Sequence, residues 1–305
     1  MDNHSIMSSD IKAEITQLKK DARAARIKDL KEKWHRFCKN RTALAGLIAI
    51  LALTLIAILA PYLSKYSYDM VDPINAYASP SREHPFGTDA VGRDLFSRIL
   101  YGARYSLAIA LTSQAVGIIL AIILGSIAGF FTGIISDLIM RFCDIFQSIP
   151  ATLMAILISQ AMGSGFFATT IALAVTTVPS VTRVARSLIM QIRGQDYIEA
   201  GRAITCSETR LIVQHIIPNI IPQIIISFTG GLSGKFIESA SLSYLGLGIQ
   251  EPLPEWGAIL SSGKAYLRYY PHLVVAPGIF IMLAALAFNL VGDGIRDALD
   301  PRLRD

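Results

Sequence analysis

The stretch TALAGLIAILALTLIAILAPYL, residues 42–63, contains 22 residues without a charged side chain. A helix rises ~1.5 Å per residue, so this stretch can cross a hydrocarbon core about 30 Å thick. Four further uncharged windows follow, at residues 105–136, 145–182, 216–234 and 273–292. Buried helices of a soluble protein are the alternative, but five such windows in 305 residues favour an all-α polytopic membrane protein.

The window at 105–136 is longer than one span requires, and the glycines within residues 129–133 predict a turn near its end. A third helix is expected to begin near Asp137. Asp137, Arg141 and Asp144 recur at positions i, i+4 and i+7, so they can pair on one helix face. We favour a charged helix start at the membrane interface over a pair of catalytic carboxylates.

Residues 145–182 are too many for one span and fit a helical hairpin, whose turn is predicted at Gly163-Ser164-Gly165. The third span is then expected to end near residue 161, and the fourth to cover about 167–183. The fifth span is expected to begin near Ile216, and the sixth to cover about 272–292. The sequence therefore predicts six transmembrane helices.

Basic residues predict the orientation of these helices. Eleven of the 28 Lys and Arg residues precede residue 42, and basic flanks are retained in the cytoplasm. Both chain termini and residues 183–215, which carry five arginines, are therefore expected in the cytoplasm of a cell-membrane protein. Residues 65–104 and 248–271 are expected outside. Because the basic excess marks orientation, we expect no nucleic-acid partner, and the long, charged N-terminus is not expected to be a cleavable signal peptide.

These expectations divide the chain into four segments. They are a charged cytoplasmic N-terminal extension at 1–41, a first transmembrane helix at 42–64, an extracytoplasmic segment with an amphipathic helix at 65–104, and a five-helix core at 105–305 that contains the cytoplasmic loop at 183–215. The three cysteines are isolated in the sequence and have no metal or redox spacing, so they are assigned no function.

The cytoplasmic loop contains a short predicted helix. Asp196 and Glu199 predict a capping box at its start, with Asp196 as the N-cap. The helix is expected to stop before Ser207, which can cap the next helix. Its small residues are Ala200, Gly201 and Ala203, and Arg202 and Thr205 complete the stretch. A face of small residues can be contacted closely by another protein, whereas a solvated connecting helix is the alternative. Gly201 lowers helix propensity by about 1 kcal/mol relative to Ala, which favours the contact.

The stretch GTDAVGRD, residues 87–94, has the glycine spacing of a phosphate-binding loop at Gly87 and Gly92. Arg93 replaces the lysine of such a loop, Asp94 replaces the magnesium-binding Ser or Thr, and Asp89 would repel phosphate. A capped helix at the outer interface explains the stretch better. Its N-cap would be Thr88 or Asp89, and its apolar face would comprise Leu95, Phe96, Ile99 and Leu100. We therefore expect no ATP site in this chain.

Two ionisable residues lie within the fifth span. Lys235 and Glu238 stand at i and i+3 and can pair. Ionisable groups at membrane depth indicate a function, so both are candidates for lining a translocation path; the alternative is that they snorkel to water at the outer end. Pro218 and Pro222 imply a kink or a broken first turn. Residues 292–294 lack the spacing of a calcium loop and are expected to be a helix exit, and no metal-binding or catalytic residues are predicted.

The cytoplasmic loop resembles the coupling motif of ABC importer permeases, which has the form E-A-A, three residues, G, nine residues, then I-x-L-P. The opening matches at residues 199–200, and Ile216-Ile217-Pro218 stands at the close. Gly201 replaces the third alanine, and Thr205 replaces the central glycine, whose sharp turn favours a residue that tolerates positive φ. Three further stretches are similar to the dipeptide/oligopeptide/nickel permeases of that family, at residues 84–107, 241–260 and 288–304.

The resemblance implies the type I importer permease fold, with five core spans after an added first helix. It implies one of two transmembrane subunits of a peptide importer, in which residues 199–203 couple to the motor. The implied partners are a similar permease subunit, two cytoplasmic ATPases that hold ATP and magnesium, an extracytoplasmic peptide-binding protein and membrane lipid, with no cofactor on this chain. A nickel importer is the alternative within the family. A stand-alone secondary transporter would be expected to show inverted repeats and midplane charges, which we do not find.

Overall fold

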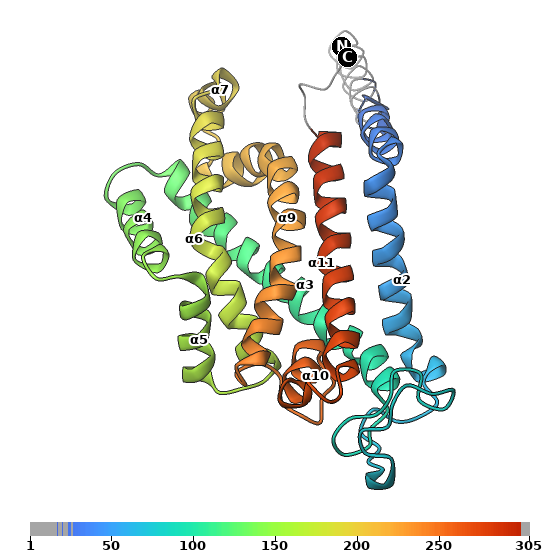
Figure 1. The fold of residues 1–305 in the computed structure, drawn as a ribbon. Coiled ribbons are helices and arrows are strands. Elements are labelled where there is room, and N and C mark those ends of the chain that lie inside the picture. Colours follow the sequence, from blue (N-terminus) through green and yellow to red (C-terminus); the bar gives the residue numbers. More distant parts are fainter. Residues whose placement is uncertain (1–16, 18–19, 21–23, 26, 300–305) are drawn as a thin grey trace, which may run out of the picture.

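The computed structural model describes residues 17, 20, 24, 25 and 27–299, and this part of the chain is helical with connecting loops and no strands (Figure 1). Long helices are α2 (Arg41–Leu63), α3 (Leu95–Phe130), α6 (Phe166–Arg193), α9 (Ile217–Tyr244) and α11 (His272–Leu299). Shorter helices are α4 (Ile134–Gln147), α5 (Ala151–Met162), α7 (Asp196–Ala203), α8 (Glu208–Arg210) and α10 (Trp256–Gly263), with 3₁₀ turns η1 (Pro73–Asn75) and η3 (Lys264–Tyr266) and a π-helical segment η2 (Leu211–Ile216).

Five described helices are long and apolar enough to cross a membrane, and a sixth span exists if the bent pair α4 and α5 counts as one. The pair turns through 92° between Gln147 and Ala151. The third span, expected from about residue 137 to 161, is therefore broken into two helices. Pro150, at the N-cap of α5, explains the break, because proline has no N–H to continue the α4 ladder. The turn predicted at residues 163–165 is confirmed between α5 and α6.

The start of α3 corrects the predicted interfacial helix. Asp94 is the N-cap, and its Oδ2 accepts from the Ser97 amide at 2.7 Å. Thr88 and Asp89 cannot cap, because the Thr88 hydroxyl accepts from the Ala78 amide and Asp89 accepts from the Arg93 amide. Residues 95–104 therefore belong to one continuous helix of 36 residues that includes the second span. The non-helical part of the expected segment at 65–104 therefore ends at residue 94, and its expected helix is the first part of α3.

Two other long helices extend beyond their predicted ends. Helix α6 continues to Arg193 and takes up residues 183–193 of the expected loop, and α11 continues to Leu299. The expected exit at residues 292–294 is wrong, because both glycines lie inside α11 and permit close packing. A Cβ at Gly294 would lie 2.2 Å from the Cβ of Ala43, so α11 contacts α2 here through its backbone.

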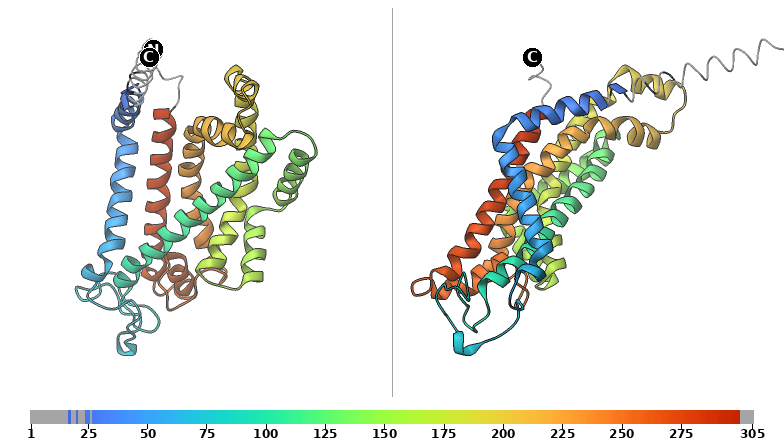
Figure 2. Two further views of the ribbon diagram at one scale, coloured as in Figure 1. Left: turned by 180° about the vertical axis from the view of Figure 1, so that it is seen from behind. Right: turned by 90° about the vertical axis from the view of Figure 1, so that its right-hand side faces the viewer.

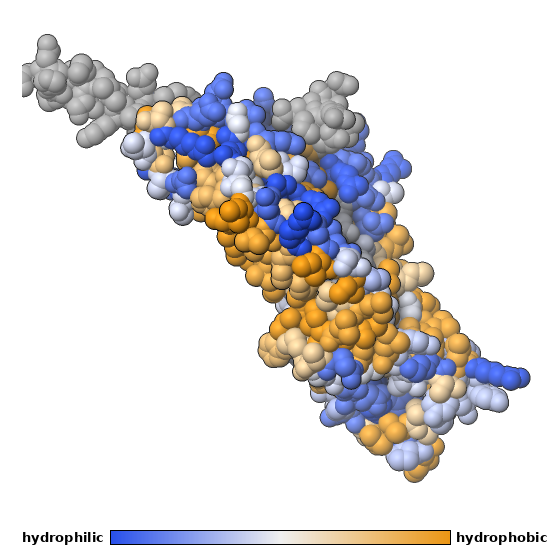
Figure 3. All heavy atoms as spheres, turned by 90° about the vertical axis from the view of Figure 1, so that its left-hand side faces the viewer, coloured by the Kyte–Doolittle hydropathy of each residue, from blue (hydrophilic) through white to orange (hydrophobic). Residues whose placement is uncertain are grey.

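The helices run between two polar ends of the molecule. The start of α2, the end of α11 and α7 lie at one end, while η1, α10 and the α5–α6 turn lie at the other (Figures 1 and 2). We call these the α7 end and the α10 end. Apolar side chains form a band between polar surfaces at the two ends (Figure 3). The start of α2, the end of α11 and the loop at 183–215 therefore lie at the same end of the molecule (Figure 1), as an even number of spans predicts.

A core at the α10 end joins α3, α9, α10 and α11. Trp256 is fully buried, and its indole Nε1 donates to the Ile99 carbonyl at 2.9 Å. Phe236 of α9 stacks on Phe288 of α11, with ring centroids 5.3 Å apart. Close approach is possible because Gly102 faces Trp256, where a Cβ would meet the indole at 2.8 Å. Burying an aromatic side chain contributes roughly 2–3 kcal/mol, so this cluster holds the four helices together.

Candidate functional site

Helix α7 lies at the tip of the α7 end (Figure 1). One of its side chains is buried. Ile198 is fully buried in a cluster that includes Phe130 of α3 and Ile189 of α6. The guanidinium of Arg202 lies 5.0 Å from the centroid of the Phe130 ring, a cation–π contact. The remaining face is exposed and includes Glu199, Ala200, Arg202 and Ala203. The helix is thus anchored on one side and open on the other.

The predicted capping box at the start of α7 is wrong. Asp196 is the first helical residue, and Gln195 occupies the N-cap without a side-chain hydrogen bond. The two acidic residues of the first turn, Asp196 and Glu199, still face the positive end of the helix dipole, which favours them there. Ser207 does occupy the N-cap of α8 as predicted, but its hydroxyl makes no capping bond in the structure.

Thr205 forms the sharp turn that ends α7, at the position where the family motif has glycine. Its φ is +59°, in the left-handed region. The Thr205 amide donates to the Arg202 carbonyl at 2.9 Å, and the Cys206 amide donates to the Gly201 carbonyl at 3.1 Å. These two bonds define a Schellman motif with Thr205 at C′. The threonine therefore does not abolish the turn, although a non-glycine residue there costs about 1–2 kcal/mol.

Gly201 lets α7 pack against η2. A Cβ at this position would lie 2.7 Å from the Cδ2 atom of Leu211, which is buried. The side-chain amide of Asn219 in α9 donates to the Tyr197 hydroxyl at 3.2 Å and adds a second tie. Pro218 lies in the first turn of α9 and Pro222 lies inside it, after a π-helical segment, so the expected irregular start of this span is confirmed. Helix α7 and the start of α9 therefore form one packed unit.

Lys235 and Glu238 of α9 form the expected ion pair, 2.7 Å between Nζ and Oε2. The ammonium also donates to the Leu173 carbonyl and to the Thr176 hydroxyl of α6, each at 3.0 Å. The Lys235 side chain is 6% exposed and that of Glu238 is 33% exposed. Lysine therefore does not snorkel to water; it ties α9 to α6, and the carboxylate is the more accessible partner.

Gln114 is a buried polar residue that the sequence analysis did not identify. Its amide nitrogen donates to the carbonyls of Ser227 and Phe228 in α9, at 3.2 and 3.3 Å. The Thr177 hydroxyl of α6 donates to its Oε1 at 3.4 Å. These bonds join α3, α6 and α9. A glutamine inside an uncharged window could have predicted such a contact between helices.

Four charged residues form a network of ion pairs at the α10 end. Arg93 Nε donates to Asp89 Oδ2 at 2.6 Å, and Arg93 Nη2 donates to both oxygens of Glu251, at 2.8 and 2.9 Å. Arg98 Nη2 donates to Glu251 Oε1 at 3.3 Å. Burial lowers the pKa of the Arg93 guanidinium, but its bonds to Glu251 and Asp89 outweigh this, so the pKa lies above its ordinary value. The sequence analysis identified Asp89 and Arg93 but missed Arg98 and Glu251.

The glycines of the 87–94 stretch serve this loop geometry. Gly87 and Gly92 both have φ of +80°, and a Cβ on Gly92 would lie 1.7 Å from the Asp72 carbonyl oxygen. Asp94 accepts from His84 Nδ1 at 2.9 Å in addition to capping α3. The stretch therefore builds a folded loop around two carboxylates, and the amides of Val91 and Arg93 donate to the Asp89 carboxylate, which takes the place that a bound phosphate would need.

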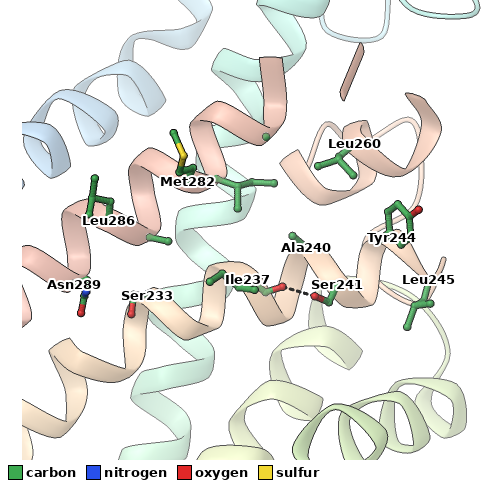
Figure 4. Close-up of a pocket in the computed structure, with 13 residues that line it drawn as sticks. Ser233, Ile237, Ala240, Ser241, Tyr244, Leu245, Leu260, Met282, Leu286 and Asn289 are labelled. Carbon is green, nitrogen blue, oxygen red and sulfur yellow. Dashed lines mark hydrogen bonds between the residues drawn. The ribbon is translucent and has the colours of Figure 1, made fainter. Parts of the chain in front are cut away.

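A groove of about 820 Å³ lies between α9 and α11 (Figure 4). Its walls are mainly apolar, with Ile237, Met282 and Leu286 among them. The Ser241 hydroxyl in this groove donates to the Ile237 carbonyl of its own helix at 2.7 Å. The groove therefore offers few free hydrogen-bonding groups to a polar solute.

Comparison with known proteins identifies the class of this fold and site. Residues 121–305 match the family of binding-protein-dependent transport system inner membrane components, and the chain belongs to this family. Residues 30–80 match the N-terminal transmembrane domain of oligopeptide transport permease C. The fold is similar to that of a chain of the inward-facing MetNI methionine ABC transporter, with a TM-score of 0.56 at 19% identity over 68% of this chain and 98% of the other.

Curated relatives place the chain within one branch of the family. It is 41% identical to the dipeptide transport system permease protein of Alkalihalophilus pseudofirmus, over 90% of both chains. It is 39% identical to the oligopeptide transport system permease protein of Bacillus subtilis, over 88% of both chains. It is also 39% identical to a glutathione transport system permease protein of Pectobacterium atrosepticum, over 90% of this chain and 91% of the relative. The expected resemblance and fold are confirmed.

Proposed function

We propose that this chain is one transmembrane subunit of an ATP-driven peptide importer. The observation that carries the proposal is the family membership together with relatives that transport dipeptides, oligopeptides and glutathione. The subunit would form half of the translocation path in the cell membrane, with both termini in the cytoplasm. A second, similar permease subunit would form the other half, and an extracytoplasmic binding protein would deliver the peptide.

The exposed face of α7 is the proposed contact for a cytoplasmic ATPase, which would hold the ATP and magnesium that this chain is not expected to bind. Three features support this role. The helix is anchored by Ile198 and leaves Glu199 to Ala203 accessible. It packs on η2 through Gly201 and contacts α9 through the bond from Asn219 to Tyr197, so a displacement of α7 would be transmitted to a transmembrane helix. The basic residues near it are also consistent with a cytoplasmic position.

The remaining predicted residues take two roles in this proposal. Lys235 and Glu238 would line the translocation path, because an ion pair with a partly exposed carboxylate inside a span is stable only where it contacts water or protein. The loop built around Gly87, Asp89 and Arg93 would form part of the surface that receives the binding protein, since it projects from the α10 end (Figure 1).

Crosslinking tests the α7 contact directly. A single cysteine at position 202, in a chain whose three native cysteines are replaced, is expected to crosslink to the ATPase in the assembled complex. A matched cysteine at position 245, on the exposed α10 end, is expected to give no ATPase crosslink. An intact complex with no crosslink from position 202 would refute the coupling role of α7.

A further inference from the structure

A pocket of about 420 Å³ lies between α4, α6 and α9, and five polar residues together with Val184 and Leu188 line it. We propose that it binds the C-terminal carboxylate of the transported peptide, with Arg183 as the anion-binding group. This inference rests on the proposed function and adds to it a site and a recognised chemical group. The polar lining residues are Gln147 of α4, Ser180, Arg183 and Ser187 of α6, and Gln223 of α9.

The polar residues of α6 form one continuous face. Thr176, Ser180, Arg183 and Ser187 recur at i, i+4, i+7 and i+11, which places them on one side of a helix. The last three are exposed in this subunit. Arg183 and Ser187 lie where α6 extends past the expected span and are open to water there, and Ser180 continues this polar face into the span. The face therefore belongs to a wet surface of the assembled transporter.

This face connects the pocket to the ion pair of α9. Thr176, at the α10-directed end of the face, accepts from Lys235, whose other partner is Glu238. Gln223 in the pocket and Ser227 one turn further along α9 are four residues apart and lie on the same side. Polar groups of α6 and α9 thus run side by side from the pocket toward the Lys235–Glu238 pair. A polar solute that passes the ion pair would meet the pocket next.

Arg183 is poised to exchange partners. Its Nη2 donates to Asp144 Oδ1 at 2.7 Å, and both side chains are about half exposed, at 52% and 49%. Exposed ion pairs contribute only ~0–1 kcal/mol, so replacing Asp144 by a ligand carboxylate costs little. A guanidinium has five N–H donors in a planar fork that fits a carboxylate. Because Asp144 competes for the same group, the ligand is bound weakly enough to leave, as transport requires.

The other lining groups fit the peptide end that carries this carboxylate. Glutamine and serine side chains both donate and accept hydrogen bonds, as an amide backbone requires. A volume of about 420 Å³ falls within the usual range for small-ligand sites. The same pocket is poorly suited to a free metal cation, because its one exposed cationic group, Arg183, would repel it. The chemistry therefore favours a peptide over nickel as the solute.

The test uses the complete complex in proteoliposomes with its ATPases and binding protein. Uptake is measured for one labelled tripeptide with a free C-terminal carboxylate and for the same tripeptide with a C-terminal amide. Each is compared between the wild type and Arg183→Gln, so the binding protein's own preference cancels in the ratio of variant to wild type. Arg193→Gln, on the same helix but outside the pocket, is the matched control.

Arg183→Gln is expected to lower uptake of the free-carboxylate peptide about tenfold at subsaturating concentration, which is the change expected on losing a charge-assisted hydrogen bond. Uptake of the amide is expected to stay within about twofold of wild type, which also shows that the variant folds and couples. Arg183→Lys is expected to restore part of the carboxylate uptake, since it keeps the charge.

Two outcomes would overturn the inference. Equal losses for both peptides would show that Arg183 has no carboxylate-specific role, and unchanged uptake of both would show that it has no role in binding. A wild-type complex that takes up neither peptide, although it hydrolyses ATP and binds its binding protein, would refute the proposed function itself and the site with it.

Discussion

Replacing Thr205 by glycine should stabilise the turn that ends α7. Thr205 holds φ at +59°, and a non-glycine residue in the left-handed region costs about 1–2 kcal/mol. Glycine removes this cost but adds freedom to the unfolded chain, which offsets roughly 0.5–1 kcal/mol. The backbone bonds from residues 205 and 206 to Arg202 and Gly201 do not involve the threonine side chain and should remain. The net gain should be ~0.5–1 kcal/mol.

Hydrogen exchange measures this gain locally. Since 1.4 kcal/mol corresponds to a factor of ten, the amides of residues 205 and 206 should exchange about two- to fivefold more slowly in Thr205→Gly. Thr209→Gly is the control, because Thr209 lies in α8 with helical geometry, where glycine should speed exchange of the neighbouring amides. Exchange at residues 205 and 206 that is unchanged or faster in Thr205→Gly would refute the assignment of strain to this turn.

Three further predictions concern the other contacts. Gly201→Ala should slow hydrogen exchange in α7, because alanine gains about 1 kcal/mol of helix propensity and its Cβ meets only a movable leucine methyl; faster exchange would show that this leucine cannot yield. Lys235→Met and Glu238→Gln should each lower the unfolding temperature in detergent, and their double variant should lose less than the sum by about 1 kcal/mol or more, as contacting residues do; strict additivity would contradict the pairing. Arg93→Met should destabilise the chain by roughly 3 kcal/mol, since it removes the nearer of the two guanidiniums paired with the buried Asp89 carboxylate. Glu251→Gln should cost less because the Glu251 side chain is 42% exposed; the reverse order in thermal unfolding would contradict the network.

The transmembrane architecture was predictable because uncharged windows are a local property of the sequence. Helix ends were less predictable, since backbone hydrogen bonding continues past the first charged residue: α6 runs ten residues beyond Arg183. Pro150 could have predicted the break between α4 and α5. It lies within the uncharged window at 145–182, where the absence of charge predicts a continuous helix up to the turn at residues 163–165. For the turn after α7, the motif gave the right position, and the structure shows that threonine adopts the conformation expected of glycine.

The candidate sites were only partly predictable because their partners are distant in the chain. Lys235 and Glu238 are three residues apart, so helical spacing alone predicts their pairing. Arg93 and Glu251 are 158 positions apart, and no local pattern relates them. Arg183 was recognised only as one of several loop arginines, because its pocket depends on α4 and α9 approaching α6. Such groups become visible only when the packing of the helices is known.

The helices are joined by more contacts at the α10 end, where the charged network lies, than at the α7 end. At the α10 end the ion pairs of Arg93, the buried Trp256 and the outer loop fasten several helices into a stiff block. At the opposite end, α7 rests on few anchors. Helix α9, with 28 residues, is roughly 42 Å long at ~1.5 Å per residue. A tilt of about 5° about the stiff end would carry the end near α7 through ~4 Å. In the proposed orientation the pivot of this tilt would be the extracytoplasmic end of α9, and a displacement of α7 would drive the tilt.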